Sequence, residues 1–123
     1  MEQDFDEFLH VPARLSILAL LAPADWVEFG FLRDTIATSD SALSKQVSAL
    51  ANAGYVAVRK ERDLGTRRTY VRLTAQGRQA FQRHAAALSR IVAAAGVPAE
   101  APEPGDAGEP SATEPGQRRM FPA

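Results

Sequence analysis

Two groups of side chains in the middle of the sequence have the chemistry to contact a polyanion. The first is a run of short polar residues and one lysine at helical spacing: Ser41, Ser44, Lys45, Gln46 and Ser48. The second is a set of arginines around the apex of an expected hairpin: Arg62, Arg67 and Arg68. Hydroxyl, amide and ammonium groups bond to base edges and phosphates, and guanidinium groups suit the narrow, electronegative minor groove. Both groups predict contact with double-stranded DNA.

The distribution of charge supports this interpretation. The formal net charge of the 123 residues is only −1, but residues 1–40 carry −6, residues 41–96 carry +8 and residues 97–123 carry −3. The middle segment contains ten basic residues and only two acidic ones. Such segregation indicates a polyanionic partner for residues 41–96.

Several function classes are not supported by the residues present. The chain has no cysteine, which excludes disulfides, thiolate metal sites and cysteine nucleophiles, and favours a reducing compartment. The two histidines, His10 and His84, are too few and too far apart in sequence for a metal-ligand pattern. The glycines form neither a phosphate loop nor a dinucleotide fingerprint. We therefore expect no enzymatic activity, no metal and no cofactor.

The sequence also bears on location. No apolar run reaches the roughly 18 residues that span a bilayer, and the N-terminal residues are acidic where a signal peptide would be basic. These features predict a soluble cytoplasmic protein, associated with the nucleoid and without a membrane partner.

Local patterns predict one α+β domain over residues 1–96. The expected elements are a helix over 9–22, a short extended piece over 26–29, a helix over 29–37, a helix over 41–53, strands over 55–60 and 69–73, and a long helix over 74–95. Asp40 or Ser41 is expected to cap the third helix, Gly54 to end it, and Thr74 to cap the last helix. The hairpin tip is expected near Leu64 and Gly65.

The remaining residues, 97–123, have a different composition. They hold six of the eight prolines, three of the eight glycines and no apolar periodicity. Such a segment cannot bury enough surface to offset its chain entropy. We predict a disordered acidic tail, whose role the sequence does not specify.

Three stretches, residues 10–21, 41–56 and 73–78, resemble short bacterial winged-helix transcriptional regulators of the MarR and ArsR kind. The resemblance covers about residues 8–95. It implies a winged helix-turn-helix fold with a three-helix core, a two-stranded β wing and a long C-terminal helix. It further implies a homodimeric, sequence-specific regulator with the recognition helix, about 41–53, in the major groove and the wing, about 61–68, at the minor groove.

In this family the first and last helices supply the dimer contact. The apolar stripe of the last helix is longer than a small core can cover. The expected interface residues are Leu15, Leu18, Phe81, Leu88, Ile91 and Val92.

The sequence departs from the family in two respects. Larger MarR proteins have further C-terminal helices and a ligand pocket, and metal-sensing ArsR proteins have cysteine or histidine clusters; neither feature is expected here. No effector, operator or direction of regulation can be identified. Two alternatives stay open: a winged-helix module that docks to protein without sequence-specific DNA binding, and an architectural binder without sequence preference.

Overall fold

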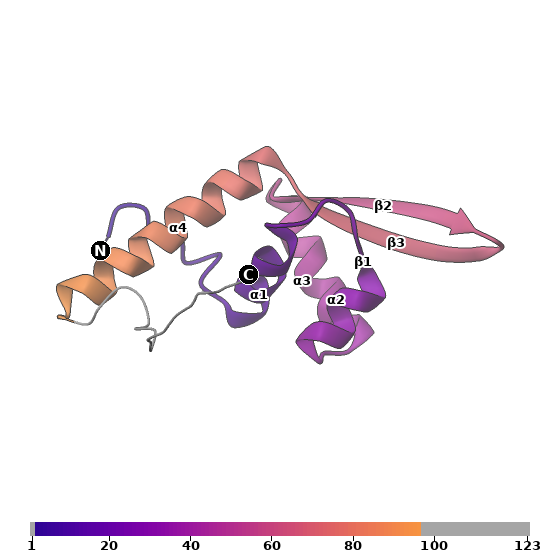
Figure 1. Cartoon of the computed structure of the whole chain (residues 1–123), viewed down its shortest axis with the longest axis horizontal. Coiled ribbons are helices and arrows are strands. Elements are labelled where there is room, and N and C mark those ends of the chain that lie inside the picture. The colour runs from indigo at the N-terminus through magenta and orange to yellow at the C-terminus, as the bar shows by residue number, and fades with distance from the viewer. Residues whose placement is uncertain (1, 97–123) are drawn as a thin grey trace, which may run out of the picture. The chain divides into compact units, whose positions relative to one another are not determined.

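The computed structural model describes residues 2–96, so the expected tail over 97–123 lies outside the described residues. The elements, in order, are α1 (Pro12–Leu21), β1 (Val27–Glu28), α2 (Phe29–Ile36), α3 (Asp40–Asn52), β2 (Val56–Asp63), β3 (Thr66–Leu73) and α4 (Ala75–Ala94) (Figure 1). Residues up to Leu88 form one compact unit, and α4 continues past that residue into a second unit. The expected α+β winged-helix architecture is confirmed.

The three strands form an antiparallel sheet in the order β1-β3-β2. Strands β2 and β3 are longer than the sequence predicts, because charged residues of the expected tip continue the ladder as far as the pair Asp63 and Thr66. Only Leu64 and Gly65 form the turn, and both have positive φ, 52° and 80°. This is the backbone pattern of a two-residue hairpin turn whose twist matches that of the strands.

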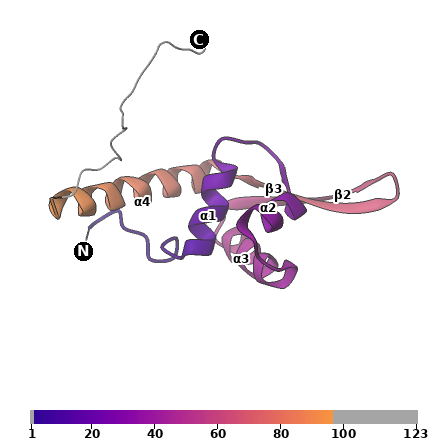
Figure 2. The same ribbon diagram turned by 60° about the horizontal axis from the view of Figure 1, so that its bottom comes forward.

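Helices α1, α2 and α3 pack together beside the base of the hairpin (Figure 2). Their buried faces form a core with the inner ends of the strands, and the core residues are Leu9, Ile17, Leu18, Leu21, Leu32, Leu43, Val47, Leu50, Val56, Val71, Leu73 and Ala80. In α3 the buried residues are Leu43, Val47 and Leu50. Helix α1 begins at Pro12 and not at Leu9 as expected. Leu9 lies in a preceding turn, in which its amide donates a hydrogen bond to the Asp6 carbonyl.

The connection between α2 and α3 is tight. Helix α2 is followed by its C-cap, Ala37, which has left-handed backbone angles, and Ser39 is the N-cap of α3. The expected cap at Asp40 or Ser41 is therefore wrong by one or two positions: the Ser39 hydroxyl accepts a hydrogen bond from the Ala42 amide at 3.1 Å. Asp40 instead accepts a 2.8 Å hydrogen bond from the Arg33 guanidinium of α2. Hydrogen bonds to Asp34 and, with a smaller effect, to Asp40 raise the pKa of Arg33, and the pair with Asp40 joins the two helices.

The start of α4 is fixed against the end of α3. The Thr74 hydroxyl donates to the Gly54 carbonyl at 2.7 Å and accepts from the Gly77 amide at 2.9 Å, which confirms Thr74 as the cap. The Thr74 amide in turn donates to the Tyr55 carbonyl at 3.1 Å. A Cβ atom on Gly77 would overlap that carbonyl oxygen, so the first turn of α4 can pack this closely against the Tyr55 backbone only with glycine at this position.

The N-terminal segment is attached to α4 through His84, a side chain with no exposed surface. Its Nδ1 accepts the Asp6 amide at 2.9 Å, and its Nε2 lies 3.2 Å from Nδ1 of His10. The Phe5 ring packs against both imidazoles with centroids 4.8 Å apart. Because Nδ1 is an acceptor, neutral His84 carries its proton on Nε2.

The stability of the fold is expected to fall as this histidine becomes protonated. Burial, with a smaller contribution from His10, lowers the pKa of His84, while Asp6 opposes the shift. The unfolded chain then binds more protons than the folded one below about pH 6.5, so stability is lost as the pH falls from that value. We expect the free energy of unfolding, measured by urea titration, to decrease between pH 7.5 and 5.5 by at most about 1.4 kcal/mol per pH unit from this residue.

His84→Asn is the matched control for this prediction. The asparagine carbonyl can accept the Asp6 amide hydrogen bond but cannot titrate. The variant should lose part of the pH dependence over the same interval, whatever its absolute stability. An equal decrease in both proteins would contradict the assignment to His84.

Candidate nucleic-acid interface

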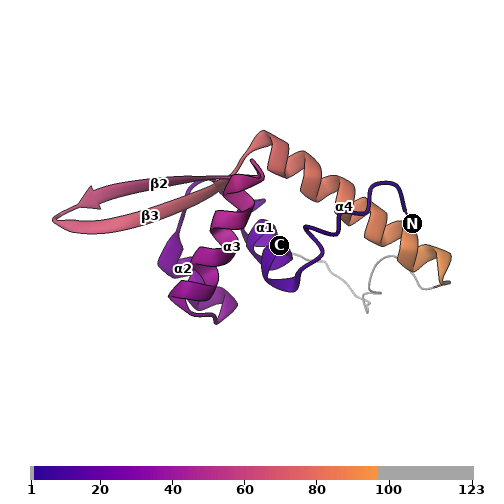
Figure 3. The ribbon, with the colours of Figure 1, turned by 180° about the vertical axis from the view of Figure 1, so that it is seen from behind.

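One face of α3 is free of the core. Ser41, Ser44, Lys45 and Ser48 are exposed, whereas Leu43, Val47 and Leu50 on the opposite side are buried. Figure 3 shows α3 from the side on which it is not covered by α1 and α2. The helix therefore presents short hydrogen-bonding side chains and one ammonium group, as the sequence predicts.

Gln46 lies elsewhere on α3. Its side chain is half-buried, and its amide oxygen accepts a 2.8 Å hydrogen bond from Nε of Arg14 in α1. The same guanidinium donates to the Phe8 carbonyl at 2.8 Å and lies over the Phe8 ring. Gln46 thus holds α3 to α1 and does not belong to the exposed face of α3.

The register of the hairpin sorts its side chains onto two faces. Successive strand residues point to opposite faces, and residues paired across an antiparallel ladder share a face. The inner face, continuous with the core, comprises Val56, Val58, Lys60, Arg62, Arg67, Thr69, Val71 and Leu73. The outer face comprises Ala57, Arg59, Glu61, Asp63, Thr66, Arg68, Tyr70 and Arg72.

Every arginine of the outer face has an acidic partner. Arg59 bonds to Glu61 at 2.8 Å, Arg68 lies 3.6 Å from Glu28, and Arg72 lies 3.3 Å from Asp25. Two of these guanidinium groups, those of Arg59 and Arg72, also lie over the ring of Trp26, 4.4 and 5.2 Å from its centroid. Arg67 and Arg68 were predicted to act together, but they lie on opposite faces of the hairpin, because adjacent strand residues point opposite ways.

The inner face carries uncompensated positive charge. Lys60, Arg62 and Arg67 form no ion pair with any residue between 2 and 96. Arg62 and Arg67 are paired directly across the ladder. Like charges in this arrangement destabilise a hairpin, so the fold alone gives no reason to place them there. An anion bound between them removes that repulsion.

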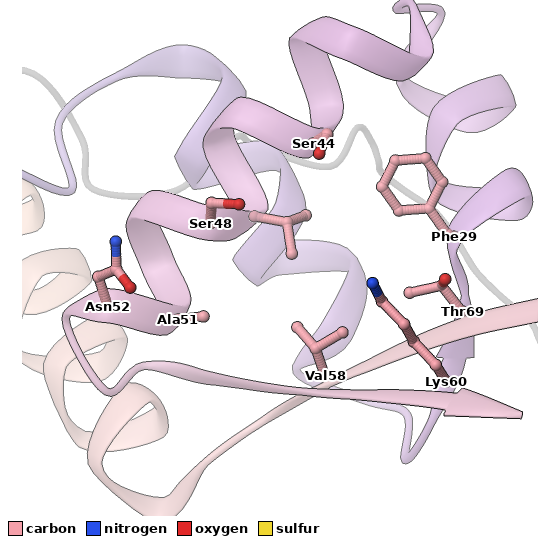
Figure 4. A pocket seen from close by; sticks show the side chains of 9 residues that line it. Phe29, Ser44, Ser48, Ala51, Asn52, Val58, Lys60 and Thr69 are labelled. Carbon is pink, nitrogen blue, oxygen red and sulfur yellow. The ribbon is translucent and has the colours of Figure 1, made fainter.

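A hollow of about 380 Å³ lies between α3 and the inner face of the hairpin (Figure 4). Its lining residues are Phe29, Ser44, Val47, Ser48, Ala51, Asn52, Val58, Lys60 and Thr69. The Lys60 side chain rises from β2 toward the serines of α3, with Phe29 and Val58 beside it. The hollow thus combines an apolar wall with an ammonium group and several hydroxyls.

Lys60 was absent from the site that the sequence predicts. The alternation along β2 could have identified it. Lys60 follows Val56 and Val58 at intervals of two residues and therefore lies on the same, inner face. The charged residues that follow have low strand propensity and obscured the continuation of β2 past residue 60.

The residues expected at the dimer interface differ in how deeply they are buried. Leu18 has no exposed surface and belongs to the core of the same chain. Leu15, Phe81 and Leu88 are half-buried, and Phe81 packs against the core. Ile91 and Val92 are exposed, at 41% and 39%.

The described part of the chain offers neither a metal-binding cluster nor a membrane-spanning helix. Residues 2–96 contain no cluster of three or more histidine, aspartate or glutamate side chains able to hold a metal ion. Within the same range, no helix has the length and apolar character needed to cross a membrane.

The chain matches a known protein family. The model of a family described as a winged helix DNA-binding domain matches residues 13–92. Among curated proteins, the uncharacterized protein MJ0432 of Methanocaldococcus jannaschii is 31% identical over 71 residues, which cover 58% of this chain and 77% of that protein.

Solved structures agree with the family match. A transcriptional regulator homologue from Pyrococcus horikoshii superposes with a TM-score of 0.69 at 22% identity, covering 73% of this chain and 89% of that chain. A MarR-family transcriptional regulator from Silicibacter pomeroyi gives a TM-score of 0.51 at 27% identity, covering 69% and 59%. The resemblance to winged-helix regulators is confirmed, although its restriction to bacteria is not, since a relative is archaeal.

Proposed function

Because the chain belongs to the winged helix DNA-binding domain family, we propose that it is a homodimeric transcriptional regulator that binds a specific DNA sequence. The observation that carries this proposal is the uncompensated positive charge of Lys60, Arg62 and Arg67 on the face next to α3. Acidic side chains neutralise the arginines of the outer face, whereas these three basic residues are available to an anionic partner.

Helix α3 is the element that reads base edges in this proposal. An α-helix fits the major groove of B-DNA, where each base pair presents a distinct pattern of donors and acceptors. Ser41, Ser44 and Ser48 offer hydroxyls that donate and accept, and Lys45 donates to a phosphate or to an acceptor on a base. Their short side chains allow the helix backbone to approach closely.

The hairpin contacts the adjacent minor groove, and the hollow receives the DNA strand between the two grooves. The turn end of the hairpin extends beyond the helices (Figure 1). Arg62 and Arg67 form a cross-strand pair near that end. Lys60, Ser48 and Thr69 line the hollow and suit a phosphate, while Phe29 and Val58 suit the apolar side of a deoxyribose. Such contacts fix the position of the protein on the duplex, and those of α3 specify the sequence.

A second copy of the chain completes the proposed binding unit. The exposed Ile91 and Val92, with Leu88, recur at spacings of three and four residues along α4, which is the pattern of a helix that packs against another helix. A two-fold dimer would place two recognition helices about 34 Å apart, one helical repeat of DNA.

The test is selection of duplexes from a random-sequence library, followed by fluorescence anisotropy of the enriched duplex and of a scrambled one. We expect an inverted repeat with half-sites about 10 base pairs apart, and weaker binding to a duplex with only one half-site. Affinity should fall about 10³- to 10⁵-fold between 50 and 200 mM salt if six to ten phosphates are contacted.

Other outcomes would reject this function. Equal binding of the enriched and scrambled duplexes would indicate an architectural binder. Absence of binding to either duplex at low salt would indicate a module that docks to protein.

A further inference from the structure

Leu64, at the tip of the hairpin, is the most exposed large apolar side chain between residues 2 and 96. Its exposed fraction is 98%, and its φ of 52° is in the left-handed region that leucine rarely adopts. Leu64 is the first residue of the two-residue turn, with Gly65 as the second. Such turns favour asparagine or aspartate followed by glycine.

The fold gains nothing from leucine at this position. The side chain is exposed and so contributes no burial, and the left-handed backbone costs more for a bulky residue than for asparagine. A strained residue that the surrounding structure does not require points to a role outside the fold.

The neighbours of Leu64 indicate what that role is. The pair Arg62 and Arg67 lies just below the turn, so the apolar tip is followed by two uncompensated guanidinium groups. This arrangement matches the minor groove, whose walls are deoxyribose and phosphate and into which proteins insert apolar side chains. A partner protein with an apolar pocket would not require the two unpaired arginines.

We propose that Leu64 enters the minor groove and makes the protein select A·T pairs at the position of the wing, which rests on the function proposed above. In the minor groove a G·C pair differs from an A·T pair by the 2-amino group of guanine. A leucine side chain against the groove floor would cover that donor without accepting its hydrogen bond. Burial of an unpaired donor is costly, whereas A·T pairs present no donor there.

Three duplexes test this selection. Hydroxyl-radical footprinting on the enriched duplex locates the minor-groove contact of the wing, and the contacted pairs are then A·T, G·C or inosine·C. Inosine lacks the 2-amino group but keeps the major-groove edge of guanine, so it isolates the minor-groove effect. We expect A·T and inosine·C to bind alike and G·C to bind about tenfold more weakly.

Two variants assign the selection to the side chain. Leu64→Asn should lose the discrimination against G·C, because an amide oxygen can accept the amino hydrogen, and should unfold at a higher temperature, because asparagine tolerates the backbone angles. Leu64→Met keeps an apolar side chain and should keep the discrimination.

Discrimination that is unchanged in Leu64→Asn, or equal binding of all three duplexes by the wild-type protein, would overturn the role of Leu64 while leaving DNA binding intact. Failure of the wild-type protein to bind any duplex would instead reject the proposed function itself.

Discussion

Replacing Arg62 and Arg67 together by alanine is expected to weaken DNA binding at least about a hundredfold, because each hydrogen bond to a charged group contributes about 1.5–3 kcal/mol. Both side chains are exposed, on the inner face and without an acidic partner in the described chain. Their removal also relieves the repulsion across the ladder, so the variant should fold at least as well as the wild-type protein. Anisotropy with the enriched duplex measures the loss.

Arg68→Ala with Arg72→Ala is the matched control, because it removes the same number of positive charges from the same hairpin. Arg68 and Arg72 lie on the outer face beside Glu28 and Asp25. This control should retain most of the affinity and most of its salt dependence. The inner-face variant should lose about 0.9 from the slope of log affinity against log salt for each phosphate contact removed. Equal losses in the two variants would show that only net charge matters.

Gly77→Ala is expected to destabilise the fold by about 3 kcal/mol, the upper end of the usual cost of overpacking, and to lower the melting temperature by about 12–24 °C. The added methyl group would overlap the Tyr55 carbonyl oxygen, which is a backbone atom. That carbonyl accepts the Thr74 amide, so moving it disturbs the corner at which α4 begins. Thermal unfolding followed by circular dichroism measures the effect.

Gly30→Ala makes the same chemical change within helix α2. Its Cβ atom would approach only the carboxylate end of Glu28, at 3.2 Å, and the Arg33 side chain, both of which can move. Alanine has a higher helix propensity than glycine by about 1 kcal/mol. The control should therefore be neutral or slightly stabilising. A Gly77 variant as stable as this one would mean that the corner adjusts without cost.

The order of the elements could be predicted because each end carries a local signal. Pro12 at the start of α1, Gly54 after α3 and Thr74 before α4 all act within one turn of the chain. The exposed serines and Lys45 of α3 followed from helical spacing alone. These parts of the interface depend on neighbours that are close in sequence.

The other parts depend on contacts between distant residues. Gln46 bonds to Arg14, which is 32 residues away. The location of Arg68 follows from the hairpin register, and that register requires strands that extend to the turn. Composition suggested shorter strands, because charged residues have low strand propensity. Leu18 was similarly ambiguous, since an apolar helical residue can face either the core or a partner.

The separation of charge between the two faces of the hairpin also bears on how fast the complex forms. The outer-face arginines are compensated at short range, so the electric field that extends into solvent from the hairpin is strongest on the side of Lys60, Arg62 and Arg67. Such a field draws a polyanion toward one side and raises the rate of productive encounter. On the proposed function, a duplex that diffuses near the protein would arrive preferentially at the face that carries α3, oriented for docking, and a larger fraction of encounters would lead to binding.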